Sequence, residues 1–531
     1  MNRTTVKRYS AIELIDAVID EGTFRSWDSA PQQPFVDQAY ADDLKRAADK
    51  SGVDEAVLTG EGRVQGRRVA VIVSEFRFLA GSIGMAAVDR IVDAVRKATA
   101  EGLPLLAGPC SGGTRMQEGT QAFLGMVAIT QAVREHKDAG LPYLTYLRNP
   151  TTGGVMASWG SLGHLTIAEP GALLGFLGPR VYEALYHEEF PAGVQLAENL
   201  YRKGLIDAVV SLEELPSIIT RVLDILLPGT PSAQLKEPGG SQAVDGQLDA
   251  WEAVQRSRNP KRPDARMVLA SADDVLPLSG TGQGENEPRL ILALATFGTQ
   301  ACVVVAQQKP RHDDDPDLGP VSLRIARRGM RLAQELQLPL LTLIDTAGAQ
   351  LSPQAEEGGL ASEIARCLSD LVALGAPSVS VLLGQGTGGA ALALLPADRT
   401  IASENSWLSP LPPEGASAII HRSALRAAEM ARSQRISVAW LRRFGVVDRI
   451  VPEPVDASLQ PRQFSQDIAL AIEAELAIAR SLESSKRLVA RTKKYSDLGR
   501  SVSLTASSDN PSRSLGRYLR VLPMLSSIEE S

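Results

Sequence analysis

Short apolar segments alternate with amphipathic helical segments along most of this chain. Residues 90–102 (RIVDAVRKATAEG) and 324–336 (RIARRGMRLAQEL) place apolar side chains at the three- and four-residue spacing of an amphipathic helix. Each segment runs into a short apolar stretch that begins with the letters LPLL, at 103–106 and at 338–341. Because short apolar strands that alternate with helices form largely parallel sheets covered by helices, the pattern predicts an α/β fold.

The same pattern occurs twice. The two LPLL stretches lie 235 positions apart (338 − 103 = 235), and the segments GLPYLTYLRNPTTGG and GAPSVSVLLGQGTGG, which end at Gly154 and Gly389, keep that offset. TIA recurs at 166–168 and 400–402, one residue out of register, and GLIDAVV (204–210) is echoed by GVVDRIV (445–451). Several anchors that share one offset indicate duplicated structure. In each unit we expect a helix, a strand, a glycine-containing loop, a helix, a strand, a Gly-Gly turn and a helix.

The length and one polar segment predict how the units are divided. A chain of 531 residues exceeds one typical core. Residues 228–245 (PGTPSAQLKEPGGSQAVD) are rich in Pro, Gly and Ser, as linkers are. We therefore expect a first domain over 1–228, a linker over 229–246, a second domain over 247–481 and a tail over 482–531 that is partly helical.

Composition and charge exclude several classes of function. The formal charge of −7 argues against a nucleic-acid or anionic-membrane partner, because both need a basic face. No run of about 18 apolar residues occurs and the segment MNRTTVKRYS is polar, so we expect neither membrane spanning nor secretion, but a cytoplasmic protein. Cys110, Cys302 and Cys367 lie far apart, which predicts no zinc ribbon and no disulfide framework.

Side chains that commonly carry catalysis are scarce. The motifs HExxH and GxSxG are absent, so a metalloprotease or a Ser-His-Asp hydrolase is not expected. His312 precedes three aspartates, 313–315, which we interpret as a solvated loop, with metal binding as the alternative. No two histidines have a metal-ligand spacing, so we expect no metal in this chain; the five are His136, His164, His187, His312 and His421.

Glycines at strand-to-helix turns are the strongest chemical feature. They occur in SGGTRMQEG (111–119), TTGGV (151–155) and GQGTGGA (384–390). Glycine permits positive φ and close approach, and the backbone N–H groups at the start of the next helix converge on one spot. Such a spot stabilises an oxyanion. The alternative is that these glycines only allow tight packing, but their recurrence in both repeats favours the chemical interpretation.

A dinucleotide fingerprint is a rival interpretation of one turn. Gly384, Gly386 and Gly389 satisfy GxGxxG, and Glu404 follows 20 residues after Gly384. The pattern lies deep inside the second unit, however, and its repeat partner at 149–154 lacks the first two glycines. Nucleotide binding therefore stays the weaker alternative.

At these motifs the sequence resembles the carboxyltransferase family of acetyl-CoA and propionyl-CoA carboxylases. The first half resembles the bacterial acetyl-CoA carboxylase β subunit, and the second half resembles the α subunit. The first-half motifs are LTGEGRVQGRRVAVIVSEFRFLAGSIG (58–84), SGGTRMQEG (111–119), NPTTGGVMASWGSLGHLTIAEPGALLGFLGPRV (149–181) and FPAGVQLAENLYRKGLIDAVV (190–210). The second-half motifs are AWEAVQRSRNPKRPDA (250–265), LIDTAGA (343–349), AEEGG (355–359), GQGTGGAALA (384–393) and PPEGASAII (412–420).

The resemblance implies two tandem crotonase-like (ββα superhelix) domains and a β–α fusion in one chain. It implies transfer of the carboxyl group from carboxybiotin to the α-carbon of acetyl-CoA or propionyl-CoA, with malonyl-CoA as the product that fatty acid biosynthesis uses. Biotin itself would act as the base. By the family's pattern, Gly153 and Gly154 hold the thioester enolate, and Gly388 and Gly389 face the ureido oxygen of biotin.

Further residues would bind the substrate on the first half. Gly81, Ser82, Gly112 and Gly113 match the family there. Arg115 and Arg180 are candidate contacts for phosphate or carboxylate, the alternative being that they form ion pairs that fasten loops to the sheet. Asp345 is interpreted as a brace for its turn and not as a base.

Three departures from the family lie on the biotin side. Gln385 stands where an acidic residue is usual, Ala347 replaces the proline of the DTPGA motif, and Gly358 replaces an arginine. These changes leave open a non-catalytic assembly subunit. A related decarboxylase that runs the transfer backwards, or from a different acyl carrier, is a further alternative. The sequence has no MKM biotinylation tripeptide and no ATP-grasp-like glycine-rich loop, so the biotin carboxyl carrier and biotin carboxylase would be separate chains. The family also implies a homo-oligomer, a dimer or a dimer-built hexamer, with each active site between two protomers.

Overall fold

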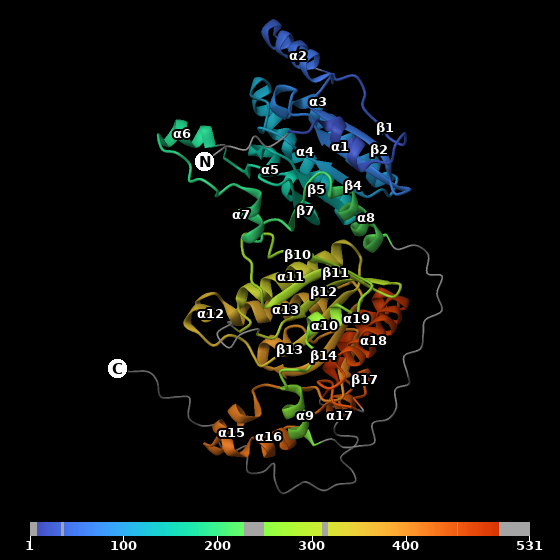
Figure 1. Cartoon of the computed structure of the whole chain (residues 1–531), viewed down its shortest axis with the longest axis vertical. Coiled ribbons are helices and arrows are strands. Elements are labelled where there is room, and N and C mark those ends of the chain that lie inside the picture. The colour runs from blue at the N-terminus through green and yellow to red at the C-terminus, as the bar shows by residue number, and fades with distance from the viewer. Residues whose placement is uncertain are drawn as a thin grey trace.

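The protein is described by a computed structural model that covers residues 8–32, 37–177, 179–227, 249–310, 317–453 and 455–498. These residues form two lobes, with the N-terminal half above the C-terminal half in Figure 1. The predicted linker at 229–246 lies outside the described residues, and so do His312 with its three aspartates and the tail beyond 498.

Within the described residues, the first lobe is built on a seven-stranded sheet of order β1-β2-β3-β4-β5-β7-β9. Strands β1, β2 and β3 are antiparallel neighbours, and every later pair is parallel, as expected where helices connect the strands. A separate two-stranded ladder joins β6 to β8. The strands are β1 (Arg25–Ser26), β2 (Val57–Val64), β3 (Arg67–Ser74), β4 (Leu105–Gly108), β5 (Tyr143–Leu147), β6 (Thr151–Thr152), β7 (Leu165–Ala168), β8 (Leu174–Gly175) and β9 (Ala208–Val209).

The second sheet repeats the first strand for strand. Its order is β10-β11-β12-β13-β14-β15-β17, with β10, β11 and β12 antiparallel and the later pairs parallel. Strand β16 pairs with the end of β14, as β8 pairs with β6. The strands are β10 (Asp274–Leu278), β11 (Leu290–Phe297), β12 (Gln300–Gln307), β13 (Leu340–Thr346), β14 (Ser378–Thr387), β15 (Arg399–Ser403), β16 (Trp407–Ser409) and β17 (Arg449–Val451). The duplication predicted from the 235-residue offset is therefore present in the topology.

The helices follow the same duplication. Helices α3 and α11 precede the two LPLL strands and start 235 positions apart (320 − 85 = 235). The helices of the first lobe are α1 (Ala11–Val18), α2 (Gln38–Ser51), α3 (Met85–Ala100), α4 (Gly119–Asp138), α5 (Gly153–Met156), α6 (Pro179–Tyr186), α7 (Ala197–Arg202) and α8 (Leu215–Leu226). Those of the second lobe are α9 (Ala250–Ser257), α10 (Ala265–Leu269), α11 (Pro320–Glu335), α12 (Pro353–Glu357), α13 (Leu360–Ala373), α14 (Gly388–Leu392), α15 (Pro413–His421), α16 (Ala427–Ser433), α17 (Val438–Arg443), α18 (Pro461–Ser481) and α19 (Ser484–Ser496).

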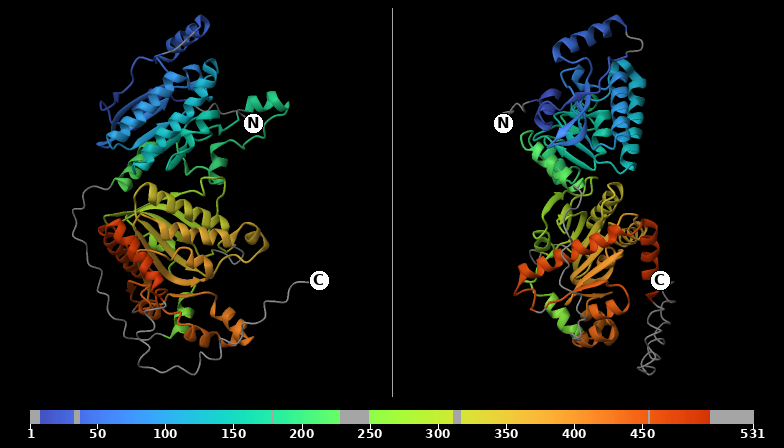
Figure 2. Two further views of the ribbon diagram at one scale, coloured as in Figure 1. Left: turned by 180° about the vertical axis from the view of Figure 1, so that it is seen from behind. Right: turned by 90° about the vertical axis from the view of Figure 1, so that its right-hand side faces the viewer.

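Alternation along the strands assigns each side chain to one of two cores. In β3, Ala70 and Ile72 face the core beneath α3 and α4, whereas Val71 and Val73 face the opposite core. Both faces of this strand are buried, which explains why its sequence is a nearly continuous apolar run. In the second lobe α18, the long red helix of Figure 2, packs across β14, β15 and β17.

The two lobes share one hydrophobic core. Ile219 and Leu223 of α8 pack in the same buried cluster as Leu292 and Val303 of the second sheet. The buried Arg328 side chain donates to Asp207 across the junction, at 2.8 Å and 2.9 Å. The lobes are therefore fastened to each other through apolar packing and a buried ion pair.

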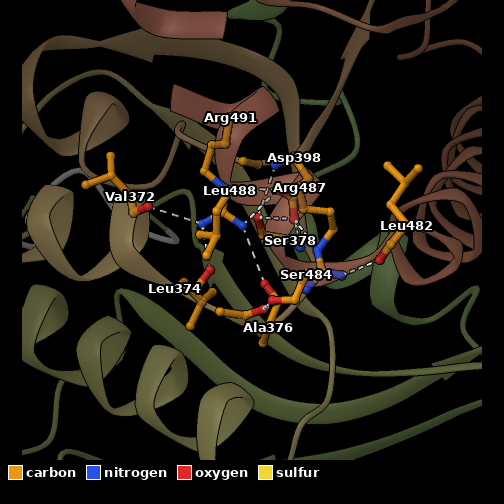
Figure 3. Close-up of polar contacts among 12 residues, drawn as sticks. Val372, Leu374, Ala376, Ser378, Asp398, Leu482, Ser484, Arg487, Leu488 and Arg491 are labelled. Atoms are coloured by element: carbon orange, nitrogen blue, oxygen red, sulfur yellow. Dashed lines mark hydrogen bonds and ion pairs between the residues drawn. The ribbon is translucent and has the colours of Figure 1, made fainter. Parts of the chain in front are cut away.

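The start of the tail packs on the second lobe as helix α19. Arg491, 2% exposed, donates to Asp398 Oδ1 at 2.8 Å and to the carbonyl oxygen of Leu374 (Figure 3). It also donates to the carbonyl oxygen of Leu371 at 2.9 Å. Arg487 donates to the carbonyl oxygen of Gly375 at 2.6 Å. The predicted partial helix in the tail is confirmed, and it is held by buried arginines.

None of the helices in the described part of the chain is both long and apolar enough to cross a membrane.

Candidate active site

Three loops of the first lobe meet at the carboxyl ends of its strands: 79–84 after β3, 111–119 after β4, and the turn 151–154. The Gly112 N–H donates to the Ala80 carbonyl oxygen at 3.0 Å, which joins the first two loops. The Thr152 N–H donates to the Ser111 carbonyl oxygen at 2.9 Å, which joins the second to the third. The structure thus brings together six of the predicted residues: Gly81, Ser82, Gly112, Gly113, Gly153 and Gly154.

The Gly-Gly turn at the start of α5 presents one backbone donor. Gly153 has φ +62°, and a Cβ there would stand 3.2 Å from the Gly113 Cα. The Gly153 N–H is already used, because it donates to the Phe176 carbonyl oxygen at 2.9 Å. Within the part of the chain that the structure describes, no group accepts the Gly154 N–H, whose nitrogen lies 3.7 Å from the place a Gly113 Cβ would occupy. Gly154 therefore leaves one backbone donor unused beside Gly113.

The helix behind this donor is short. Helix α5 has 4 residues and its counterpart α14 has 5. A macrodipole is the sum of aligned peptide units, so a single turn contributes little. The positive potential at this turn therefore comes mainly from the positioned N–H group and little from the helix behind it.

The loop at 79–81 is left-handed at three consecutive residues. Leu79, Ala80 and Gly81 have φ of +44°, +56° and +64°. Glycine is required at the third position, because a Cβ on Gly81 would stand 2.1 Å from the Cys110 carbonyl oxygen. A left-handed residue with a Cβ costs about 1–2 kcal/mol, and the sequence carries no signal for it at Leu79 or Ala80. The glycine is therefore evident from the sequence, whereas the strain at the two residues before it is not.

Arg115 faces the interior. Its side chain is fully buried, forms an ion pair with the buried Glu55 and a second with Glu118 at 3.2 Å, and donates to the Ser82 carbonyl oxygen at 2.9 Å. This geometry favours the alternative considered for Arg115, that it fastens loops. Arg180 lies in α6, and its side chain is outside what the structure describes, so its role stays a prediction.

Buried groups next to the turn support its backbone. Burial raises the pKa of the Cys110 thiol to about 11, and its Sγ donates to the Asn149 carbonyl oxygen at 3.2 Å. Burial also raises the pKa of Glu169, whose carboxylate accepts the Asn149 N–H at 2.9 Å. The two side chains hold Asn149, which lies directly before the segment that leads into α5.

The second lobe repeats this site. The Ser111 hydroxyl accepts the Gly113 N–H at 3.0 Å, and the Thr346 hydroxyl accepts the Gly348 N–H at 3.1 Å. Gly388 at the start of α14 has φ +66°, close to the +62° of Gly153. Each lobe therefore carries one glycine site of the same backbone geometry.

A buried hydroxyl lies beside the second Gly-Gly turn. Thr387 is 2% exposed, and its Oγ1 has no hydrogen-bond partner among the described residues. The next residue is Gly388, and Gly389 packs so closely on α13 that a Cβ would stand 2.7 Å from Ile364 Cδ1. Buried polar atoms are nearly always paired, so an unpaired hydroxyl next to a glycine turn fits a polar ligand at this place.

Asp345 braces this turn, as expected. Its carboxylate accepts the Gln385 N–H at 3.0 Å and lies 3.0 Å from the Lys309 Nζ. The Gln385 side chain accepts from Arg258 at 3.2 Å, and Arg258 forms an ion pair with Glu414 at 2.6 Å. The neutral Gln385 is thus integrated into the structure, and Glu414 supplies the negative charge that Arg258 faces.

The two other departures have different surroundings. Ala347 lies in the loop between the Thr346 hydroxyl and the Gly348 N–H that bonds to it. Gly358 ends α12, where a Cβ would stand 2.9 Å from the Gln354 carbonyl oxygen and 3.0 Å from Pro320 Cγ. An arginine at 358 would require this turn to shift.

The dinucleotide alternative does not fit the fold. Gly384 and Gly386 lie inside strand β14 and not in a strand-to-helix turn. The Glu404 carboxylate accepts the Glu453 N–H at 2.6 Å, so it holds a neighbouring loop. The GxGxxG letters therefore arise from a strand and the turn that follows it.

A groove of about 630 Å³ adjoins the first glycine site. One wall is formed by α2, with Arg46, Lys50 and Asp43, and the other by residues between 75 and 80, with Arg77 and Glu75. Arg8 also lines it and stacks on the Phe76 ring at 4.8 Å. A groove with several basic side chains that ends at Leu79 and Ala80 can hold an anionic ligand whose other end reaches the glycine site.

Comparisons with known proteins agree with this geometry. The sequence model of the carboxyl transferase domain matches residues 7–489. A probable biotin-dependent acyl-coenzyme A carboxylase beta3 subunit of Mycobacterium tuberculosis is 53% identical over 498 residues, which cover 93% of this chain and 99% of that protein. The acetyl-coenzyme A carboxylase carboxyl transferase subunits beta/alpha of Salinispora tropica are 36% identical, with 85% of this chain and 83% of that protein covered.

Solved structures show the same fold. The transcarboxylase 12S, solved with methylmalonyl-coenzyme A and methylmalonic acid bound, superposes with a TM-score of 0.71 at 22% identity, covering 90% of this chain and 91% of that chain. The two sheets of like topology are thus the two domains of a crotonase-like carboxyltransferase. With its repeated glycine sites and a family match over nearly the whole described chain, this protein belongs to the carboxyl transferase family of biotin-dependent acyl-CoA carboxylases.

Proposed function

We propose that the chain transfers the carboxyl group of carboxybiotin, carried on a separate protein, to the α-carbon of acetyl-CoA, with propionyl-CoA as the competing substrate. The product would be malonyl-CoA or methylmalonyl-CoA. The observation that carries this proposal is the unpaired Gly154 N–H in the β-subunit-like lobe, beside the loop 79–84 whose first residues line a groove with several basic side chains.

The first lobe would bind and activate the thioester. When the α-carbon loses its proton, negative charge collects on the thioester oxygen, and a donor already in place stabilises it. One such donor contributes about 3–4 kcal/mol of transition-state stabilisation. We assign this donor to Gly154, with Gly113 leaving the space in which the oxygen lies.

The basic groove is proposed to hold the phosphates of CoA. Arg46, Lys50 and Arg77 would face the phosphates, and the pantetheine arm would pass Leu79 and Ala80 toward Gly154. Phosphate groups are bound by charge-assisted hydrogen bonds from such side chains. Loss of Lys50 should therefore raise KM for acyl-CoA and leave kcat nearly unchanged.

The second lobe would hold biotin at Gly388, Gly389 and the unpaired Thr387 hydroxyl. When bound, carboxybiotin supplies the carboxyl group and then a basic ureido group, so the chain itself needs no catalytic base. The role of Asp345 is to keep the Gln385 backbone, and with it the end of β14, in place.

One site is proposed to draw on two copies of the chain. The two glycine sites lie in different lobes, marked by α5 and β14 in Figure 1. Apolar side chains are exposed on a helix of each lobe: Phe123 and Val127 of α4 at 60% and 66%, and Ile419 of α15 at 70%. A dimer, or a hexamer built from dimers, would cover these side chains and join the first lobe of one protomer to the second lobe of another.

The test is carboxyl transfer in reverse. The purified full-length chain is incubated with malonyl-CoA or methylmalonyl-CoA and with biocytin, and loss of the carboxylated thioester is followed. We expect decarboxylation that depends on biocytin and that is faster with malonyl-CoA. A higher kcat/KM for methylmalonyl-CoA would reassign the acyl group, and decarboxylation independent of biocytin would favour the related decarboxylase.

Absence of turnover from a folded, oligomeric protein would overturn the proposal. In that case the chain would be an assembly subunit, for which Ala347, Gly358 and Gln385 give the reason. Restoring the family residue in Gln385→Glu tests this directly: recovered activity would assign the defect to the biotin side.

A further inference from the structure

A network of hydrogen bonds and ion pairs lies behind the first glycine site. Tyr40 of α2 donates its hydroxyl to Glu118 Oε1 at 2.5 Å, and Arg115 Nη1 donates to the same Tyr40 hydroxyl at 3.2 Å. Arg115 also forms an ion pair with Glu55, and both of these side chains are fully buried. Burial and the hydrogen bond to Glu118 raise the pKa of Tyr40, so its hydroxyl stays protonated.

This network holds the segment that directly follows the strained residues 79–81. Arg115 Nη2 donates to the Ser82 carbonyl oxygen at 2.9 Å. The other oxygen of Glu118 accepts the Met85 N–H at 2.5 Å, where α3 begins. The left-handed residues Leu79 and Ala80 directly precede these anchors. A backbone in such a sparsely populated conformation persists only where its surroundings fix it.

The network also sets the loop that carries Gly113. Arg115 and Glu118 belong to that loop, and the Arg115 N–H donates to the Ile83 carbonyl oxygen at 2.9 Å. The Ile83 N–H in turn donates to the Gly113 carbonyl oxygen at 3.0 Å. The Arg115 backbone is thus tied through Ile83 to Gly113, beside which the Gly154 N–H lies.

We propose that Tyr40 is a positioning residue for the acyl-CoA site: through Glu118 and Arg115 it fixes loops 79–84 and 111–119 around the Gly154 donor. This inference rests on the proposed carboxyl transfer. It assigns to α2 a role in the chemical step, in addition to its role as one wall of the groove proposed to hold CoA.

The two roles of α2 can be separated by substitution. The Tyr40 ring packs with Leu44 of α2 and with Phe78, so Tyr40→Phe keeps the helix docked and removes the hydroxyl alone. Lys50 lies on the groove side of the same helix. Tyr40→Phe should therefore change kcat, whereas Lys50→Ala should change KM.

The experiment measures kcat and KM for malonyl-CoA decarboxylation with biocytin in the full chain. We expect Tyr40→Phe to lower kcat about tenfold with KM within a factor of two, because misplacement by 1 Å costs up to about a hundredfold. Tyr495→Phe is the matched control, since it removes a buried hydroxyl that accepts the Ala397 N–H in the second lobe, far along the chain from these loops. Its kinetics should match the wild type.

A double substitution tests the connection to Glu118. If both residues act through one network, kcat of the double variant Tyr40→Phe/Glu118→Gln should be no lower than kcat of Glu118→Gln alone. If the two residues act independently, the fold-losses of kcat in the single variants should multiply in the double variant. The inference would be overturned if Tyr40→Phe left kcat unchanged. It would also be overturned if Tyr40→Phe lowered kcat and raised KM by a similar factor. An inactive wild type would instead refute the proposed function, so the two failures are distinguishable.

Discussion

At the residue scale, both glycine sites depend on backbone that a side chain would displace. Gly153 and Gly388 have nearly the same positive φ, and each begins a one-turn helix. A Cβ at Gly153 would stand 3.4 Å from the Gly112 carbonyl oxygen as well as 3.2 Å from Gly113. Glycine is thus needed at 153 for two reasons: its positive φ and the lack of space for a Cβ. The cost of the positive φ can be measured separately from the cost of the Cβ contact.

Gly153→Ala should lower kcat for reverse carboxyl transfer by about 100-fold, the lower end of the effect of losing an oxyanion donor, because the new Cβ forces the 112–113 loop away from Gly154. The measurement is the biocytin-dependent decarboxylation rate at saturating malonyl-CoA.

Gly102→Ala is the matched control. Gly102 has φ +64°, and a Cβ there meets nothing within 4 Å. An alanine at 102, just after α3, would therefore have the same unfavourable φ as an alanine at 153, but its Cβ would contact no neighbouring group. Equal losses of kcat in the two variants would show that strain, and not the site geometry, explains the effect.

At the scale of elements, α19 shows how a polar tail becomes part of a domain. It is rich in basic residues, yet Arg487 and Arg491 are 6% and 2% exposed. Arg491 pairs with Asp398 and satisfies carbonyl oxygens at the end of α13 (Figure 3). Lys494 adds an ion pair with Asp448 at 2.7 Å. The described part of the tail therefore belongs structurally to the second domain.

Arg491→Ala should lower the free energy of unfolding of the second domain by about 3 kcal/mol, because it leaves the buried Asp398 without its closest cation. Chemical denaturation and hydrogen exchange in α19 measure the change. Lys486→Ala, on the exposed face of the same helix with 77% of its side chain accessible, should stay within about 0.5 kcal/mol of the wild type. A loss below about 1 kcal/mol in Arg491→Ala would mean that α19 contributes little.

At the scale of the whole molecule, the junction between lobes contains a buried histidine. Tyr143 donates its N–H to His164 Nδ1 at 3.0 Å, and His164 Nε2 lies 3.5 Å from Glu335 of α11 in the other lobe. Burial, together with the nearby Lys137 and His136, holds the pKa of His164 well below its usual range. Burial lowers the pKa of His136 as well. Both rings are therefore neutral in the folded protein near neutral pH.

This predicts that the protein loses stability as the pH falls below about 6.5. There the unfolded chain binds protons on histidine that the folded chain does not, so the free energy of unfolding decreases by up to about 1.4 kcal/mol per pH unit for each such histidine. Urea denaturation between pH 8 and pH 5 measures the slope. His164→Asn should reduce the slope, and the exposed His187→Asn should not. Equal slopes in all three proteins would contradict the assignment.

The proposed composite site also makes a prediction for mixtures. Gly154→Val and Gly389→Val should each be inactive. The first disrupts the acyl-CoA side of every site in the oligomer, and the second disrupts the biotin side. Mixed protomers should regain part of the activity, since some sites then combine an intact first lobe with an intact second lobe. Size-exclusion chromatography checks that the variants exchange. Exchange without recovered activity would place each complete site within one chain.

Much of this architecture follows from the sequence because duplication and periodicity are local signals. The 235-residue offset predicted two units of like topology, and both sheets have it. Apolar runs predicted the buried parallel strands, and glycine spacing located the two turns at Gly153 and Gly388. Each of these features depends on residues that lie close together in the chain, where propensity and pattern act directly.

Other features were decided by tertiary structure. The sequence named Gly153 and Gly154 as a pair, but Phe176, brought back beside β6 by the β6–β8 ladder, takes up the Gly153 N–H. Arg115 was a candidate substrate contact, and Glu55 and Tyr40, both more than 50 positions away, make it a buried anchor. Sequence determines which residue can donate or turn; which donor is left free depends on the distant groups that folding brings to it.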